Sequence, residues 1–397
     1  MDQVLNPYTP GSGARPNELA GRATEVQELD VALQRLLIGR SAKSQLLTGL
    51  HGVGKTVLLS EFARVAARRG FIHEHIEVAD DGGLPLRLAV ALGKALFKLG
   101  GKKKVKGVNR RALGVLKAFT LTLPEGGSLL PDVDVDVEVV PGMSDSGHLA
   151  SDLSGLFEEV GQAARAHDGG VFLTIDEMHR LPPASLEALV VGLQRVSQLG
   201  LPVVIAGAGL PTMAALSGEA RSYLERLFRF RPLGPLSPDE GADALVVPAA
   251  AEGVGWKGPA LTRVYEVTMG YPSFIQEFAK QAWDLAEEGS KSIRLGDVER
   301  SIPLATAELD EGFFGARAAG TTVVERAYLR AMAELGHGVV RSGEVAELLG
   351  KKTTQVAPVR DALIKKALCF SPRFNELAFT VPMFDQFMKR WIPSLPS

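Results

Sequence analysis

The sequence predicts an α/β protein, in which a parallel sheet flanked by helices is followed by two smaller, largely helical segments. Three observations support this fold class. Between residues 21 and 235, apolar stretches of strand length alternate with stretches of helical spacing, which is typical of a doubly wound sheet. At 45–63 an apolar strand leads directly into a glycine-rich octapeptide and then a helix. After the prolines at 232–238, residues 236–315 show helical patterns only.

The composition bounds the class of protein. The 397 residues, 46% of them hydrophobic and 23% charged, are enough for two or three domains with real cores. A net charge of −2 does not by itself require a nucleic-acid or membrane partner. Cys369 is the only cysteine, which excludes an intrachain disulfide and fits a reducing compartment. With no apolar stretch of membrane-spanning length and no leader peptide pattern, we expect a cytoplasmic protein without a membrane partner.

The octapeptide matches G-x-x-x-x-G-K-[ST], the phosphate-binding pattern called Walker A. Its residues are Gly49, Leu50, His51, Gly52, Val53, Gly54, Lys55 and Thr56, and Val57 continues the helix that follows. Glycines let the backbone curl around a phosphate with its N–H groups pointing inward, and the helix N-terminus adds partial positive charge. Lys55 is expected to reach the outer phosphates of ATP, and the Thr56 hydroxyl to ligate Mg²⁺.

A second motif lies at 171–177, where an almost wholly apolar strand ends in Asp176 and Glu177. Acids at the carboxyl end of a central parallel strand lie where open α/β sheets bind their ligands. This is the Walker B pattern. We expect Asp176 to hold Mg²⁺ through water and Glu177 to polarise the water that attacks the γ-phosphate. The two motifs together predict Mg²⁺-dependent ATP hydrolysis.

Four segments complete the predicted organisation. Residues 1–20 are a Pro/Gly-rich arm, in which 6–20 are not expected to form a regular element, and 21–235 form the nucleotide-binding core. Within that core, 100–147 is expected to be an insertion. It begins with a basic stretch, which is either a nucleic-acid contact or a solvated face. It continues into a predicted β-hairpin over 119–140, where acids and valines alternate. Residues 236–315 are expected to be a lid of helices only.

Residues 316–397 are predicted to form three helices followed by two short strands, which is the winged-helix pattern. From 341 to 397 there are nine Lys/Arg and five Asp/Glu, a local basic surplus on an acidic chain. Lys351, Lys352 and Arg360 lie at the turn and on the third helix, where double-stranded DNA would be contacted. A protein-binding role for this segment remains the alternative.

Taken in this order, the motifs resemble those of an AAA+ ATPase. They are most similar to the branch of the origin-recognition initiators, which is related to the STAND-type signal-transduction ATPases. Gly21 and Arg22, followed by Glu25, resemble the element that lines the adenine pocket in these families. Arg226 lies where such proteins carry an arginine finger that acts on a neighbouring subunit, with Arg221 as the competing candidate. The resemblance therefore implies ATP and ADP as ligands and self-association into an oligomer.

Two positions depart from that family pattern. Gly207, Ala208 and Gly209 offer no polar side chain at the end of the fourth predicted strand. Residues 270–272 stand where many members carry a second sensor arginine, and resemble instead a Gly-x-Pro lid element in which Pro272 faces the nucleotide. Both departures indicate slow hydrolysis rather than fast turnover.

We therefore expect an ATP-binding switch with slow hydrolysis, whose nucleotide state controls self-association and DNA binding through the winged helix. One rival is a signalling or defence scaffold whose winged helix binds an unidentified protein. Another is a regulator of transposition or phage replication that assembles on DNA as an ATP-dependent filament.

Overall fold

The computed structural model describes residues 1–11, 13–79, 81–100, 108–123, 137–213 and 224–395. The chain divides into two compact units, and each is treated separately below. One unit, called here the α/β unit, comprises residues 23–48 and 55–232. The other, called the helical unit, comprises residues 1–22, 49–54 and 233–397.

A five-stranded sheet forms the centre of the α/β unit, with strand order β2-β3-β4-β1-β5 and parallel pairing throughout. The strands are β1 (Ser44–Thr48), β2 (Phe71–Glu77), β3 (Gly170–Asp176), β4 (Val203–Gly209) and β5 (Phe228–Pro232). Every residue of β1, β3 and β4 is buried, as their apolar sequences predicted. This confirms the predicted α/β fold class.

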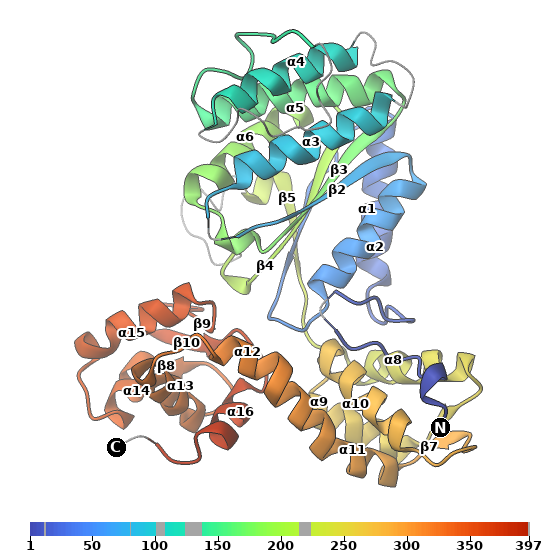
Figure 1. Ribbon diagram of the computed structural model, residues 1–397, viewed down its shortest axis with the longest axis vertical. Helices are drawn as coiled ribbons and strands as arrows, with labels where there is room; N and C mark the ends of the chain where they lie inside the picture. The colour runs from blue at the N-terminus through green and yellow to red at the C-terminus, as the bar shows by residue number, and fades with distance from the viewer. Residues whose placement is uncertain (12, 80, 101–107, 124–136, 214–223, 396–397) are drawn as a thin grey trace. The chain divides into compact units, whose positions relative to one another are not determined.

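Helices cover both faces of that sheet, with α1 and α2 on one side and α3, α5 and α6 on the other (Figure 1). The α/β unit contains α1 (Ala23–Leu37), α2 (Lys55–Arg68), α3 (Leu84–Gly100), α4 (Val108–Leu121), α5 (Leu149–Ala166) and α6 (Pro183–Gln198). Two short 3₁₀ turns, η3 (Met178–Arg180) and η4 (Pro211–Met213), follow β3 and β4. Leucine, valine and alanine side chains from these elements form one core.

The predicted β-hairpin over 119–140 is wrong where the structure describes it. Residues 119–121 end helix α4, and 137–140 belong to no strand. The rest of the acid–valine alternation lies outside the described residues. Helical spacing within 112–119 (Ala112, Leu116, Phe119) outweighs the alternating pattern, because that face of α4 is buried in the core of the α/β unit.

The helical unit contains more strand than the sequence indicated. Its helices are η1 (Gln3–Leu5), α8 (Pro238–Ala251), α9 (Gly258–Thr268), α10 (Pro272–Leu285), α11 (Leu295–Glu308), the π-helical turn η5 (Leu309–Phe314), α12 (Gly315–Ala318), α13 (Val323–Leu335), α14 (Ser342–Leu348), α15 (Thr353–Lys365) and α16 (Phe384–Trp391). Its strands are β6 (Gly255–Trp256), β7 (Ser292–Ile293), β8 (Val340–Arg341), β9 (Cys369–Phe370) and β10 (Glu376–Phe379).

The expectation of helices only over 236–315 is therefore wrong, because β6 and β7 pair in parallel. Both strands are two residues long, too short for a period-two pattern to stand out in the sequence.

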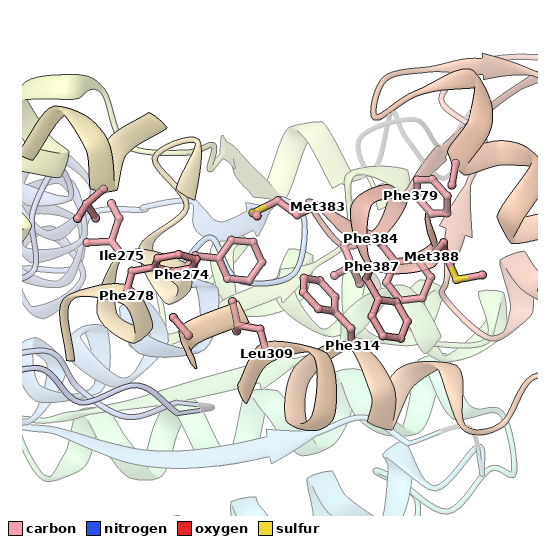
Figure 2. Close-up of a cluster of buried hydrophobic side chains, with 14 of the residues drawn as sticks. Phe274, Ile275, Phe278, Leu309, Phe314, Phe379, Met383, Phe384, Phe387 and Met388 are labelled. Atoms are coloured by element: carbon pink, nitrogen blue, oxygen red, sulfur yellow. The ribbon is translucent and has the colours of Figure 1, made fainter. Parts of the chain in front are cut away.

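Aromatic side chains hold the helical unit together (Figure 2). Phe314 of η5 contacts Phe274 of α10 with ring centroids 5.9 Å apart, and stacks on Phe387 of α16 at 5.3 Å. Phe384 of α16 continues the cluster to Phe379 of β10 at 5.5 Å. Helices from 236–315 and elements from 316–397 thus share one core, so the boundary predicted at residue 316 crosses a continuous hydrophobic core.

The N-terminal arm is anchored to the helical unit. Tyr8 is buried; its hydroxyl donates to the Leu245 carbonyl at 2.5 Å and accepts from Trp256 Nε1 at 2.7 Å. Its ring meets Trp256 and Trp283 edge-on, with centroids 6.2 and 6.3 Å away. An arm whose helical structure is the single turn η1 is therefore anchored by a buried aromatic side chain, which backbone periodicity could not reveal.

Candidate functional site

The glycines of the octapeptide meet two different requirements. Gly52 and Gly54 have φ angles of +82° and +90°, a region that side chains with a Cβ avoid. A Cβ at Gly52 would also stand 2.4 Å from Ser273 Oγ, whereas one at Gly54 would meet nothing within 4 Å. The loop is therefore tightly packed at Gly52 and open at Gly54.

The backbone of this loop is hydrogen-bonded from three directions within the helical unit. His51 N–H donates to the Thr380 carbonyl at 3.0 Å, and Ser273 N–H donates to the Gly52 carbonyl at 3.2 Å. Arg22 donates through Nη2 to the Val53 carbonyl at 3.3 Å and to the Gly234 carbonyl at 2.9 Å. Arg22, the start of α10 and the residue after β10 thus all hold residues 51–53.

Ser273 and Thr380 are the residues that the sequence analysis missed. Ser273 follows Pro272, the first residue of α10, so its N–H lies at a helix start and has no carbonyl partner within the helix. Thr380 is fixed by its own N–H, which donates to Leu368, and by its hydroxyl, which donates to Ala367. Neither position has a sequence signal, because both contact the loop through backbone atoms.

The side chains of the octapeptide lie at the start of α2. Thr56 Oγ1 donates to Asp176 Oδ2 at 2.6 Å, which joins the first turn of α2 to the end of β3. Lys55 and Asp176 are buried, with exposures of 7% and 4%. The hydroxyl and carboxylate oxygens are hard donors of the kind that Mg²⁺ prefers, so this pair fits the predicted metal site.

Glu177 adopts a left-handed backbone conformation with φ +56°, which turns the chain from β3 into η3. Its N–H donates to Asp176 Oδ1 at 2.8 Å, and its carbonyl accepts from Arg180 N–H at 2.9 Å. Burial, reinforced by the Asp176 charge, raises the pKa of the Glu177 carboxyl, while Lys55 and Arg180 act in the opposite direction. A carboxylate with a raised pKa beside Asp176 suits the predicted role as a base.

The end of β4 shows why no polar side chain stands there. A Cβ at Gly207 would lie 2.0 Å from Met178 Sδ, and one at Gly209 would lie 3.3 Å from the backbone nitrogen of His179. The glycines let η3 approach the strand backbone directly, and Met178 fills the space that a side chain at 207 would need.

The remaining predicted site residues are placed as follows. Gly21 has φ +68°, and a Cβ there would meet the Glu240 side chain at 2.6 Å, so Gly21 and Arg22 lie against α8 and the loop. Arg226 is exposed, two residues before β5, whereas Arg221 lies outside the described residues.

Of the predicted DNA contacts, Lys351 and Lys352 are exposed just before α15. Arg360 pairs with its neighbour Asp361 at 2.9 Å.

Two parts of the chain match known domain families. Residues 18–206 match the model of the AAA ATPase domain, and residues 311–388 match a domain of unknown function. No curated protein sequence is significantly similar to this chain.

Among solved structures, a Walker-type ATPase of Pyrococcus abyssi is similar with a TM-score of 0.55 and 16% identity, over 97% of this chain and 99% of that one. The Aeropyrum pernix Orc1 protein, solved in complex with DNA, gives a TM-score of 0.47 at 16% identity, over 94% of each chain.

These findings define the enzyme class. The chain has a P-loop NTPase fold. The match of residues 18–206 to the AAA ATPase domain identifies its activity as ATP hydrolysis. In the part of the chain that the structure describes, no helix combines the length and apolarity needed to cross a bilayer.

Proposed function

We propose that this ATPase works as a nucleotide-controlled switch, in which the state of the phosphate-binding loop controls the C-terminal segment 316–397. The observation that carries this proposal is the pair of backbone hydrogen bonds from the loop to Ser273 of α10 and to Thr380 after β10. A phosphate that reorders residues 51–53 must strain or break these bonds. Ser273 Oγ supports a ligand here, because it is buried and has no hydrogen-bond partner among the described residues.

In this proposal ATP binds to residues 49–57, with Gly21, Arg22 and Pro272 at its other edges. Thr56 and Asp176 would hold Mg²⁺, which would neutralise charge on the phosphates during hydrolysis. Glu177 would take the proton of the attacking water. The missing polar side chain at the end of β4 supports slow turnover, which suits a switch better than a motor.

The output of the switch in this proposal is DNA binding by a winged helix. Supporting it are the order α13, β8, α14, α15, β9, β10 and the antiparallel sheet β8-β10-β9. Lys351 and Lys352 are exposed at the start of α15, as phosphate contacts must be. The Arg360–Asp361 pair makes Arg360 the weakest of the three predicted contacts, because binding DNA would require breaking it.

A gel-shift titration at increasing salt tests this output. Affinity for a duplex should fall steeply with salt, and Lys351→Ala with Lys352→Ala should reduce both the affinity and the salt slope. Lys389→Ala is the matched control, because Lys389 is an exposed lysine on α16. Salt-independent binding, or none, would overturn the DNA assignment.

The alternative output is binding of a protein, and one observation favours it. Phe374, in the turn between β9 and β10, is 92% exposed, and an exposed aromatic ring is a common anchor for a protein partner. In that case the chain would be a STAND-like scaffold, and Phe374→Ala would abolish partner capture without changing ATP hydrolysis.

We further propose that ATP promotes self-association, with Arg226 acting on nucleotide bound by a neighbouring subunit. The exposure of Arg226 supports this, since a finger must reach out of its own subunit. Mass photometry with and without ATP and DNA reports assembly and its nucleotide dependence together. An Arg226→Ala protein with unchanged activity per site at oligomer-forming concentrations would rule the finger out.

A further inference from the structure

The carboxylate of Glu177 faces two cationic or ionisable groups from the turn that follows it. Glu177 Oε2 lies 3.4 Å from His179 Nε2 and 3.7 Å from Arg180 Nε. The side chains of Glu177 and His179 are mostly buried, at 19% and 9% exposure, while that of Arg180 is 37% exposed. The three residues belong to one short segment that directly follows β3.

The position of η3 depends on the glycines of β4. Met178 packs where a side chain at Gly207 would stand, and the His179 backbone lies against Gly209. The turn η3 also contacts η4, which follows β4. The 3₁₀ turn is therefore braced on strand backbone, which fixes the direction from which His179 and Arg180 approach the carboxylate.

The orientation of the Glu177 carboxylate depends on the charges around it. Asp176 and Glu77 of the neighbouring strand both oppose the negative charge on Glu177, whereas Lys55 and Arg180 favour it. With glycine and alanine at the end of β4, that strand supplies no side chain to orient Glu177. Electrostatic attraction from η3 can supply the orientation instead, because it acts in a largely buried setting.

We propose that Arg180 and His179 are positioning residues, which hold the Glu177 carboxylate for catalysis in place of a polar side chain at the end of β4. This inference rests on the proposed role of Glu177 as the base. If it is correct, removing Arg180 or His179 loosens Glu177 without altering the groups that bind ATP.

The test is steady-state ATPase kinetics together with ATP binding. Arg180→Gln should lower kcat by roughly tenfold or more, because small displacements of a reacting group cost rates of this size or larger, with KM and the ATP dissociation constant unchanged. Arg180→Lys, which keeps the charge, should recover part of the loss. His179→Gln, which keeps a polar hydrogen-bonding group, should lower kcat less than His179→Leu does.

Arg195→Gln is the matched control, since it removes an exposed arginine from an arginine–glutamate pair of 2.7 Å between α6 and α5 that involves none of Glu177, His179 and Arg180. It should leave kcat unchanged. Circular dichroism melting of each variant checks folding, and the exposed Arg180 is the position least expected to disturb it.

The outcomes separate this inference from the function on which it rests. Normal ATPase activity in Glu177→Gln would remove the base assignment and the positioning role together. An inactive Glu177→Gln combined with unchanged kcat in both Arg180→Gln and His179→Leu would overturn the positioning role alone. A rise in KM at constant kcat would also overturn it, since it would place these residues in ATP binding.

Discussion

The two halves of the Walker A octapeptide differ in what holds them. Gly49–Gly54 groups with the helical unit, where backbone atoms of His51, Gly52 and Val53 are hydrogen-bonded. Lys55 and Thr56 group with the α/β unit, where the Thr56 side chain bonds to Asp176 at 2.6 Å. Consecutive residues of one motif thus belong to two packing units.

This difference suggests different roles for the two parts of the octapeptide: the side chains of Lys55 and Thr56 act on the nucleotide, and the backbone of Gly49–Gly54 connects the loop to the rest of the helical unit. The side-chain half carries the groups that are proposed to bind phosphate and metal, and these groups are recognisable in the sequence because their residue types matter. The backbone half is hydrogen-bonded to α10 and to the residue after β10 through main-chain atoms, which every residue type carries, and the positive φ angles at Gly52 and Gly54 favour glycine there. We infer that changes in the side-chain half act mainly on nucleotide binding, whereas changes in the backbone half act on the stability of the loop, on binding through that stability, and on how binding is transmitted.

The largest effect is expected in the side-chain half. Lys55→Ala should weaken ATP binding by about 10- to 150-fold, because a charge-assisted bond to phosphate, worth about 1.5–3 kcal/mol, is lost from a buried position. Isothermal titration calorimetry measures the affinity of each variant for ATP. Arg64→Ala is the control on the same helix, where Arg64 pairs only at 3.3 Å with Glu61 and is 46% exposed. Wild-type affinity in Lys55→Ala would contradict the site assignment.

A smaller but still large effect is expected at Gly52. Alanine there combines an unfavourable φ of +82° with a Cβ 2.4 Å from Ser273 Oγ, so we expect a stability loss of about 1–3 kcal/mol and weaker ATP binding. Thermal unfolding with and without ATP measures both.

Gly142→Ala is the matched control for Gly52→Ala. Gly142 has the same φ, with nothing within 4 Å of its would-be Cβ, so the difference between the two variants isolates the contact with Ser273. The double variant Gly52→Ala with Ser273→Ala should recover part of the loss. Equal losses in the Gly142 and Gly52 variants would mean that the Ser273 contact is unimportant.

Removal of one backbone hydrogen bond should have a moderate effect. Ser273→Pro deletes the N–H that donates to Gly52, at a helix start where proline is tolerated, and should cost about 1 kcal/mol. Stopped-flow release of a fluorescent ATP analogue should then be several-fold faster. Ser273→Ala keeps the N–H and should release nucleotide at nearly the wild-type rate, so identical behaviour of the two variants would count against the loop contact.

The smallest effect concerns the reactivity of Cys369 in β9. Burial raises the pKa of this thiol to about 12, so at pH 8 only about one thiol in 10⁴ is ionised in the folded state. Reaction with a thiol reagent should therefore be slow until the protein unfolds. Cys369 pairs with Phe379, the neighbour of Thr380, so ATP should change the labelling rate if the loop controls this segment. A rate that ATP leaves unaltered would argue against such control.

Much of the α/β unit could be predicted from sequence. Its strands are apolar runs, so the strand predicted at 171–177 lies within one residue of β3 at both ends, and the predicted end of the fourth strand at 207–209 coincides with the end of β4. The hairpin prediction at 119–140 failed because an acid–valine alternation was extended into residues that are helical. The short strands β6 to β8 were missed because pairs of two residues leave no periodic trace.

The sequence by itself determined which residues are candidates for the chemistry: Lys55, Thr56, Asp176 and Glu177 are recognised by residue type and by their places beside apolar strands. Tertiary structure alone decided what surrounds them. It brought Ser273 and Thr380 to the loop and Met178 against Gly207, and it directed His179 and Arg180 at Glu177. The physical reason is that catalytic side chains must be particular residue types, whereas backbone hydrogen bonds and close packing depend on where the chain runs.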